Sequence, residues 1–403
     1  MKKYIFLLVA VVGVALLFVG GYFLRQGLDT PPDTSRGGNL PGVGDQNIPQ
    51  NNQGSQPTTP GANPKDLVQV SAGPVLDYFV SPTGNLIYVQ PDGQIFESRG
   101  GQATTLSGTR IEGLARASFS YNGGKLLVLF GRLNQFQASV FDVKTKAWQP
   151  LTTSPETAAW SPIDEKLAFL SRAAGMANIS TLDLSNAKAK PVELLKLRVW
   201  DVDLGWPVKN KLLLKERTGA RSLGSVWIYD LDKKTLSSLL AHRTGLRSVW
   251  NSTLTLGLVF GINEASGGSL WLADGAGVTT QGLSFKTRPD KCAFSERTET
   301  VTSTINTTGT VPKKTAATRV VNLLTCGVPR NFSSLTDLNI LDDYDKEGLF
   351  TIDNIFEINL EDGSSQTIFN EASKNLDVSR VKIFSTRFYF IDRYSGSLYS
   401  VAL

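Results

Sequence analysis

A short pattern recurs along the chain from about residue 67 onward, and it limits the possible folds more than any other feature. Its first part is a strand of small or apolar residues that ends in a turn, as in FVSPTGNL, SFSYNGGKL, AWSPIDEKL and GWPVKNKL. A second strand follows, then a third of the type SVWIYDL, then a fourth that is rich in Thr and Ser. The third strands align at Arg99, Asp142, Asp183, Asp230, Asp274, Asn359 and Ala402. Four strands every 40 to 45 residues or so are typical of a β-propeller blade.

One interval in this series is about twice as long as the others, between Asp274 and Asn359. It must hold either an additional blade or one blade with insertions. The segment from Glu296 to Arg319 contains nine threonines in 24 residues and offers little apolar material for packing between blades. The sequence therefore predicts seven blades with an insertion in the sixth, and eight blades is the alternative.

The ring also needs a strand from outside the repeats, because the last repeat ends at its third strand, SLYSVAL. The segment LVQVSA, Leu67 to Ala72, precedes the first repeat and can supply the missing fourth strand. Pairing these two segments would remove two exposed sheet edges.

No amphipathic helix of ten residues or more is evident in residues 66–403, so we predict an all-β domain.

The segments AWSPIDEKLAFLSR, FVSPTGNLIYV and SVWIYDLDKKT resemble the WD40-like propeller repeats of the TolB type, over about residues 67–403. The resemblance implies that the domain is a binding platform. Some members of that family carry a separate peptidase domain, for which this chain has no room. Such repeats specify the fold more closely than the function.

The N-terminus predicts a membrane anchor in residues 1–26. The 21 residues from Tyr4 to Leu24 carry no charge and would span a bilayer as a helix. Lys2 and Lys3 favour a cytoplasmic N-terminus, which would place the propeller outside the cytoplasm. A cleaved signal peptide and a buried soluble helix are the alternatives, but the apolar run is long for a signal peptide and lacks its small-residue cleavage pattern.

Residues 27–65 are rich in Pro, Gly, Asn and Gln and lack aromatic residues, so we expect a disordered linker.

The formal charge of +5, from 41 basic and 36 acidic residues, is too small for a nucleic-acid-binding surface. The chain has two cysteines and one histidine, which leaves no zinc-binding pattern. We therefore expect neither nucleic acid nor a required cofactor.

The two cysteines fall on neighbouring predicted strands of the sixth blade. Cys292 lies in DKCAFS, and Cys326 lies in VVNLLTCGV. Opposed residues on antiparallel strands are close enough for a disulfide, and an extracytoplasmic location would favour one. The alternative is a pair of buried free thiols.

An acidic loop, LDDYDKEGLFTIDN, is a weak candidate for calcium. Asp343, Asp345 and Glu347 alternate with other residues and are followed by a glycine, which partly matches a calcium-binding loop. The twelfth position is Asn354, which cannot supply the usual bidentate carboxylate. The alternative is a solvated acidic loop.

Basic residues recur before or within the first strands of blades, at the predicted rim of the channel. They are Arg116, Arg247, Lys291 and Arg380. Several cations at one rim could bind an anionic envelope polymer or glycan. Acidic residues occupy the same rim, so scattered solvated charges are the alternative; they are Asp77, Asp201, Asp203, Asp290 and Asp377.

Those carboxylates also permit an enzyme hypothesis, because glycosidases use a pair of acids. Asp201 with Asp203, or Asp77 with Asp377, could be such a pair. A Ser/His/Asp hydrolase is disfavoured, because His242 lies in LLAHRTG and no GxSxG motif occurs. We therefore predict a membrane-anchored, extracytoplasmic and non-catalytic binding or scaffold module for protein or envelope glycan, with a glycan-active hydrolase as the alternative.

Overall fold

The computed structural model describes residues 66–132, 135–173, 175–186, 188–198, 201–263, 267–305, 313–330 and 340–403. The anchor predicted in residues 1–26 and the linker predicted in residues 27–65 lie outside these ranges. Within the described ranges, no helix has both the length and the apolar character needed to cross a bilayer.

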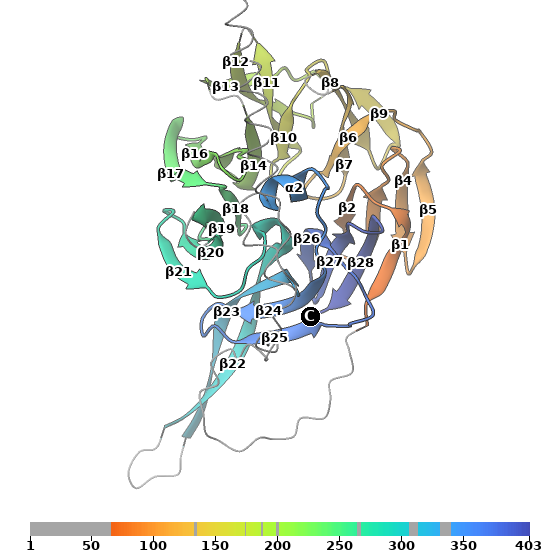
Figure 1. Cartoon of the computed structure of the whole chain (residues 1–403). Coiled ribbons are helices and arrows are strands. Elements are labelled where there is room, and N and C mark those ends of the chain that lie inside the picture. Colours follow the sequence, from red (N-terminus) through yellow and green to blue (C-terminus); the bar gives the residue numbers. More distant parts are fainter. Residues whose placement is uncertain are drawn as a thin grey trace, which may run out of the picture. The chain divides into compact units, whose positions relative to one another are not determined.

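Residues 66–403 form seven four-stranded antiparallel sheets arranged as blades around a central axis (Figure 1). In blades 1 to 6 the first strand lies nearest the axis and the fourth lies outermost. The domain is a seven-bladed β-propeller, as the repeat predicts, and the eight-bladed alternative is wrong.

The strands follow the chain from blade to blade. Blades 1 to 3 contain β2 (Asp77–Val80), β3 (Leu86–Val89), β4 (Ile95–Arg99) and β5 (Gln102–Ser107); β6 (Leu114–Phe119), β7 (Lys125–Arg132), β8 (Gln135–Asp142) and β9 (Ala147–Pro150); and β10 (Thr157–Trp160), β11 (Lys166–Ala173), β12 (Met176–Asp183) and β13 (Val192–Leu197). Blades 4 and 5 contain β14 (Val202–Val208), β15 (Lys211–Glu216), β16 (Leu223–Asp230) and β17 (Thr235–Thr244); and β18 (Arg247–Trp250), β19 (Leu256–Asn263), β20 (Gly267–Asp274) and β21 (Thr279–Leu283). Blade 6 contains β22 (Cys292–Ile305), β23 (Lys313–Pro329), β24 (Asp353–Asn359) and β25 (Ser365–Phe369), and blade 7 contains β26 (Val378–Phe384), β27 (Arg387–Asp392), β28 (Ser397–Ala402) and β1 (Val68–Pro74).

The recurring acidic position of the repeat has a structural role in the turn between the third and fourth strands. The Asp142 carboxylate accepts a hydrogen bond from the backbone N–H of Thr145 at 2.8 Å, and Asp230 accepts one from Lys233 at 2.9 Å. Asp side chains are favoured in turns because they bond nearby backbone N–H groups in this way. The repeated acid therefore fixes the turns and is no evidence of chemistry.

The ring closes with an N-terminal strand. β1 pairs antiparallel with β28, with Val68 opposite Ser400, and completes blade 7. The Ser71 hydroxyl accepts a hydrogen bond from the Leu398 N–H at 2.9 Å, and Ser71 is buried. The prediction that LVQVSA supplies the missing strand is confirmed.

The long interval in blade 6 holds two insertions. The hairpin of β22 and β23 extends beyond the rest of the blade (Figure 1). The connection from β23 to β24 contains the short helix α2 (Ile340–Asp345). A 3₁₀ turn, η1 (Pro289–Lys291), leads into β22.

The hydrophobic core consists of layers between neighbouring blades. Between blades 1 and 2, for example, Val89 and Ile95 are fully buried against Leu126 and Phe141. Each of the seven buried clusters in the described residues draws on adjacent blades in this way. Because this packing lies between the blades, the side chains of the innermost strands that face the channel can be charged.

Candidate functional site: a charged channel mouth beside helix α2

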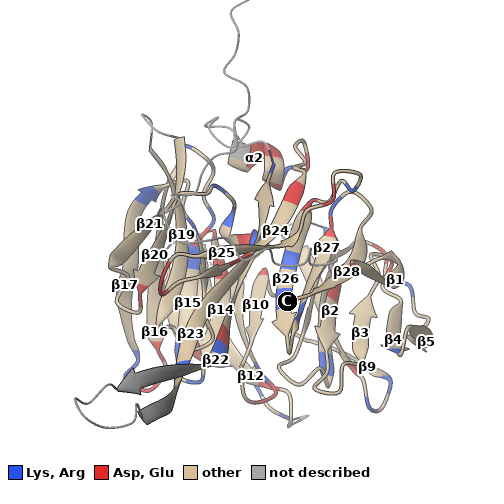
Figure 2. Cartoon of the chain, turned by 90° about the horizontal axis from the view of Figure 1, so that it is seen from below, with Lys and Arg blue, Asp and Glu red and all other residues tan. Residues whose placement is uncertain are grey.

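Helix α2 lies over the centre of the ring (Figure 1). Figure 2 shows the ring from the side, with α2 at the top of the view. We call the side of the ring that carries α2 the α2 face. Leu341 is fully buried in the cluster between blades 5 and 6. The Asp342 carboxylate accepts a hydrogen bond from the Ala220 N–H of blade 4 at 2.8 Å. The helix is therefore packed into the domain over blades 4 to 6.

Lys291 is buried and paired with carboxylates, whereas the sequence predicted a cation on the rim that could bind a ligand. Its side chain is 1% exposed, and its ammonium lies 2.7 Å from both Asp353 and Asp377. It also donates a hydrogen bond to the Thr351 hydroxyl. Burial raises the pKa of Asp353, as does the nearby charge of Asp377, while Lys291 opposes both effects. Lys291 is thus a structural cation that joins blade 6 to blade 7.

Arg247 belongs to a second set of charges that holds α2 in place. Both oxygens of Asp345 are engaged, one by Arg247 at 2.7 Å and the other by Arg288 at 2.8 Å. Arg288 also forms an ion pair with Asp290 at 2.9 Å. The guanidinium of Arg393 stacks on the Tyr344 ring, with its central carbon 3.7 Å from the ring centroid. Arg247 is therefore committed to α2.

The remaining rim contains a cluster of opposite charges from blades 2 to 4. Arg217 donates hydrogen bonds to Asp201 at 3.0 Å and to Asp203 at 2.5 Å. Arg116 lies 3.6 Å from the same Asp203 carboxylate and donates a hydrogen bond to the Glu156 carbonyl at 3.2 Å. About 39% of the Arg116 side chain remains exposed, so its guanidinium can accept a further anion.

The electrostatics of this cluster favour an added negative charge. Burial lowers the pKa of Arg116, and the positive charges of Arg217 and Arg380 lower it further. The negative charges of Asp203 and Asp201 act in the opposite direction. Burial lowers the pKa of Lys215, and Asp203 and Asp290 only partly offset this. Arg380 is exposed. We call Arg116, Lys215, Arg217 and Arg380, with Asp201 and Asp203, the charged mouth.

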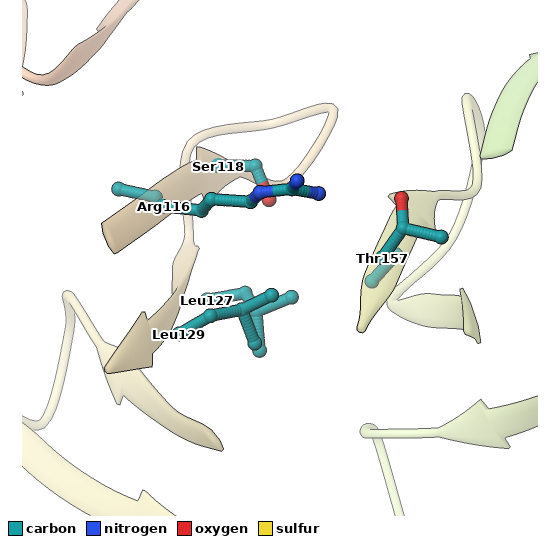
Figure 3. Close-up of a pocket in the computed structure, with 7 residues that line it drawn as sticks. Arg116, Ser118, Leu127, Leu129 and Thr157 are labelled. Carbon is teal, nitrogen blue, oxygen red and sulfur yellow. The ribbon is translucent and has the colours of Figure 1, made fainter. Parts of the chain in front are cut away.

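A pocket of about 90 Å³ opens next to Arg116, between blades 2 and 3. Figure 3 shows the Arg116 side chain reaching toward Thr157, with Leu127 and Leu129 on one side of the space. Ser118 contributes a further hydroxyl to the lining. The arrangement combines one cation, two hydroxyls and an apolar wall, which can hold a small anionic group.

The candidate carboxylate pairs differ from what a glycosidase needs. Asp377 is fully buried and bonded to Lys291 and Arg393, so it cannot touch a substrate. Asp201 and Asp203 share one partner, Arg217. Burial acts to raise the pKa of Asp203, but Arg217 and Arg116 outweigh it and hold the pKa below its ordinary value. A general acid requires a raised pKa.

The other predicted sites have separate outcomes. A disulfide joins Cys292 and Cys326, which face each other across β22 and β23, as predicted.

The acidic segment proposed for calcium begins in α2, and both Asp345 oxygens are held by arginines. Across the described residues, no group of three or more His, Cys, Asp or Glu side chains could hold a metal ion. Asp343 and Glu347 therefore have no shared ligand geometry.

Sequence reasoning missed several residues that the fold brings to this face. Arg217 follows the apolar strand KLLLKE, and Arg393 follows FYFID, so each is the charged residue just after a buried strand. That position recurs at the α2 face because the second strand of each blade ends there. The position after a second strand could have identified Arg217 from the sequence. The pairing of Arg217 with Asp203 depends on the geometry of the blade and could not be predicted.

Comparison with solved structures places the fold among known propellers. The domain is similar to an oligogalacturonate lyase in complex with manganese (TM-score 0.54, 10% identity, covering 84% of this chain and 93% of that one). It is equally similar to an oligogalacturonate lyase from Vibrio parahaemolyticus (TM-score 0.54, 8% identity, covering 84% and 93%). TolB from Acinetobacter baumannii is also similar, at 13% identity and a TM-score of 0.38, covering 62% of this chain and 60% of that one. At these identities the likeness shows the fold alone.

The sequence itself matches no family model and no curated protein.

Proposed function

We propose that this chain is a non-catalytic binding module that takes an acidic glycan of the cell envelope at the charged mouth. The observation that carries the proposal is the partly exposed side chain of Arg116, which has two other arginines near it and shares the Asp203 carboxylate with one of them. A sugar carboxylate at this position would form charge-assisted hydrogen bonds with the guanidinium and the nearby hydroxyls.

The place of display is a part of the same proposal. The uncharged run from Tyr4 to Leu24 would anchor the chain, and Lys2 and Lys3 would keep its N-terminus in the cytoplasm. The propeller would then lie outside the cytoplasm, where envelope glycans occur and where a disulfide is stable. Residues 27–65 would form the tether.

The pairing of Asp201 and Asp203 supports binding over hydrolysis. Both carboxylates are held by Arg217, and the lowered pKa of Asp203 keeps it ionised at neutral pH. An ionised Asp203 supplies a base or nucleophile but no proton donor. A glycan-active hydrolase is therefore the weaker proposal.

Oligogalacturonate is a suitable probe because every sugar in it carries a carboxylate, and two structural neighbours are named for acting on it. We expect the full chain in detergent to bind it, and to bind its uncharged methyl ester at least about tenfold more weakly. Chromatography of the same samples after incubation should recover the oligosaccharide intact. Equal binding of acid and ester would reject an anionic ligand, and shortened products would establish an enzyme.

A further inference from the structure

The turns between third and fourth strands carry lysines in three consecutive blades. In blades 2, 3 and 4 each of these turns contributes two lysines, and all six side chains are exposed; they are Lys144 and Lys146, Lys188 and Lys190, and Lys233 and Lys234. The equivalent turns of blades 5 and 6, residues 275–278 and 360–364, contain no lysine. The propeller fold therefore does not require lysine at this position. We call the six residues the lysine face.

The lysine face lies on the side of the ring opposite the α2 face. The second strand of each blade ends at the α2 face, so the antiparallel third strand ends on the opposite side, and its turn to the fourth strand lies there. Figure 2 shows Lys and Arg, in blue, in turns along the lower edge of the ring, away from α2. The lysine face and the charged mouth thus lie on opposite sides of the domain.

The carboxylates in these turns are engaged by other groups. Asp142 is paired with Lys125 at 2.8 Å, and Asp183 and Asp230 accept hydrogen bonds from backbone N–H groups of their own turns. Asp232 accepts a hydrogen bond from a side-chain amide of blade 4 at 2.9 Å. Across the part of the chain that the structure describes, no ion pair involves a member of the lysine face. The six ammonium groups are therefore available to an external anion.

The chain enters the domain on the same side as the lysine face. β1 begins at Val68, which lies opposite Ser400 near the end of β28. Because β28 is a third strand, this end of the pair lies away from the α2 face. Residues 1–65 precede the domain, and they include the uncharged run from Tyr4 to Leu24. A linker from a bilayer would therefore meet the ring on its lysine-bearing side, without passing around it.

We propose that the lysine face docks on the anionic phospholipid headgroups of the bilayer that anchors the chain, an inference that rests on the proposed anchor. The tether of residues 27–65 is long enough for either side of the ring to approach the bilayer, so it sets no orientation by itself. Each lysine near an anionic surface strengthens binding roughly fivefold, and the attraction falls off within the Debye length. Docking in this way would turn the charged mouth away from the membrane, where a glycan can reach it.

Energy transfer to a labelled lipid tests this orientation on the full chain in vesicles of neutral phosphatidylcholine, alone or mixed with anionic phosphatidylglycerol. Both native cysteines are in the disulfide, so a membrane-impermeant dye can be attached to T235C, beside the lysine face, or to A372C, on the α2 face. With phosphatidylglycerol, transfer from T235C should exceed transfer from A372C. The difference should vanish in neutral vesicles and at high salt, because the attraction is electrostatic.

Charge reversal separates the lysine face from net charge. K188E/K190E/K233E/K234E, in the T235C background, should lower the ratio of docked to free domains at least about tenfold. The control R221E/K286E/K346E/K374E reverses four charges in loops of the α2 face and should dock as wild type does.

Flotation of the same vesicles tests the anchor separately, and no glycan is present in either measurement. The chain should float with both kinds of vesicle. A chain that fails to float with neutral vesicles would reject the anchor and the docking with it. Equal transfer from the two labels in phosphatidylglycerol vesicles, or equal docking of the two quadruple variants, would overturn the docking and leave the anchor in place.

Discussion

The ammonium of Lys291 lies 2.7 Å from the Asp377 carboxylate, and neither side chain reaches solvent. The two residues belong to adjoining blades, and Lys291 contacts Asp353 at the same distance. Tyr344 of α2 also donates a hydrogen bond to Asp377, at 2.8 Å. One buried cation thus joins the last two blades, beneath the helix that covers the centre of the ring.

Removal of this cation should strongly destabilise the domain. K291A would leave two buried carboxylates without their shared partner, which typically costs about 3 to 5 kcal/mol. Chemical denaturation monitored by fluorescence should detect the loss. K144A, at an exposed position, should change stability by less than about 0.5 kcal/mol. Similar unfolding midpoints for the two variants would show that the buried network contributes little.

The closing strand makes a prediction about truncation. Deletion of residues 1–65 leaves β1 intact, whereas deletion of residues 1–74 removes it and exposes an edge of β28. We expect the shorter form to lose several kcal/mol of stability or to aggregate, because an unpaired edge and buried apolar surface become exposed. Thermal melts and light scattering of the two forms provide the comparison. Matching melting temperatures and clear solutions would disprove the role of β1.

The disulfide should stabilise the domain by restricting the unfolded chain. Its cysteines are separated by 34 residues, and a loop of that size corresponds to about 3 to 4 kcal/mol. Unfolding in urea with and without a reductant measures this contribution. The C292A/C326A variant should show no response to the reductant. If wild type were equally insensitive, the bridge would have no energetic role.

The turn residue Asp142 predicts a loss of stability in acid. Burial acts to raise its pKa, but hydrogen bonds from Lys125 and Thr145 outweigh it and lower the pKa from 3.8 to about 2. A carboxyl with a lowered folded-state pKa stabilises the fold above its unfolded pKa, and this contribution disappears as the pH falls from about 4 to about 2. The shift converts to about 2.4 kcal/mol, which solvent screening of this partly exposed carboxylate reduces to about 1 to 2 kcal/mol.

The D142N variant isolates this effect. The stability difference between wild type and D142N should shrink as the pH falls through that range. D66N, at an exposed residue, provides the control. A difference that stays constant from pH 6 or so down to about 2 would contradict the low pKa of Asp142.

The blades were predictable because their signals are local. Asp142 and Asp230 recur at turns because each bonds backbone N–H groups two or three residues away, so the spacing is visible in the sequence. The cysteine pair was predictable for a related reason, since consecutive strands of one blade are antiparallel neighbours.

The charged mouth was predictable only in part. Arg116 and Arg380 were identified from their place near the first strands. The burial of Lys291 was missed because it depends on Thr351 and Asp353, which lie 60 and 62 residues away beyond an insertion. The commitment of Arg247 to α2 depends in the same way on Asp345, 98 residues away. No local pattern encodes such contacts.

The central claim is that an anionic ligand binds at the charged mouth, and the most direct test is the salt dependence of that binding in charge-matched variants. Oligogalacturonate should be titrated into wild type, R116A/R380A and K144A/K146A by calorimetry, at about 50 and about 300 mM salt. We predict that wild type and K144A/K146A lose affinity equally as salt rises, since Lys144 and Lys146 lie in the exposed turn between β8 and β9. R116A/R380A should bind at least about tenfold more weakly at low salt and depend less on salt. Equal affinities for the two double variants, or binding of wild type that does not respond to salt, would contradict the account.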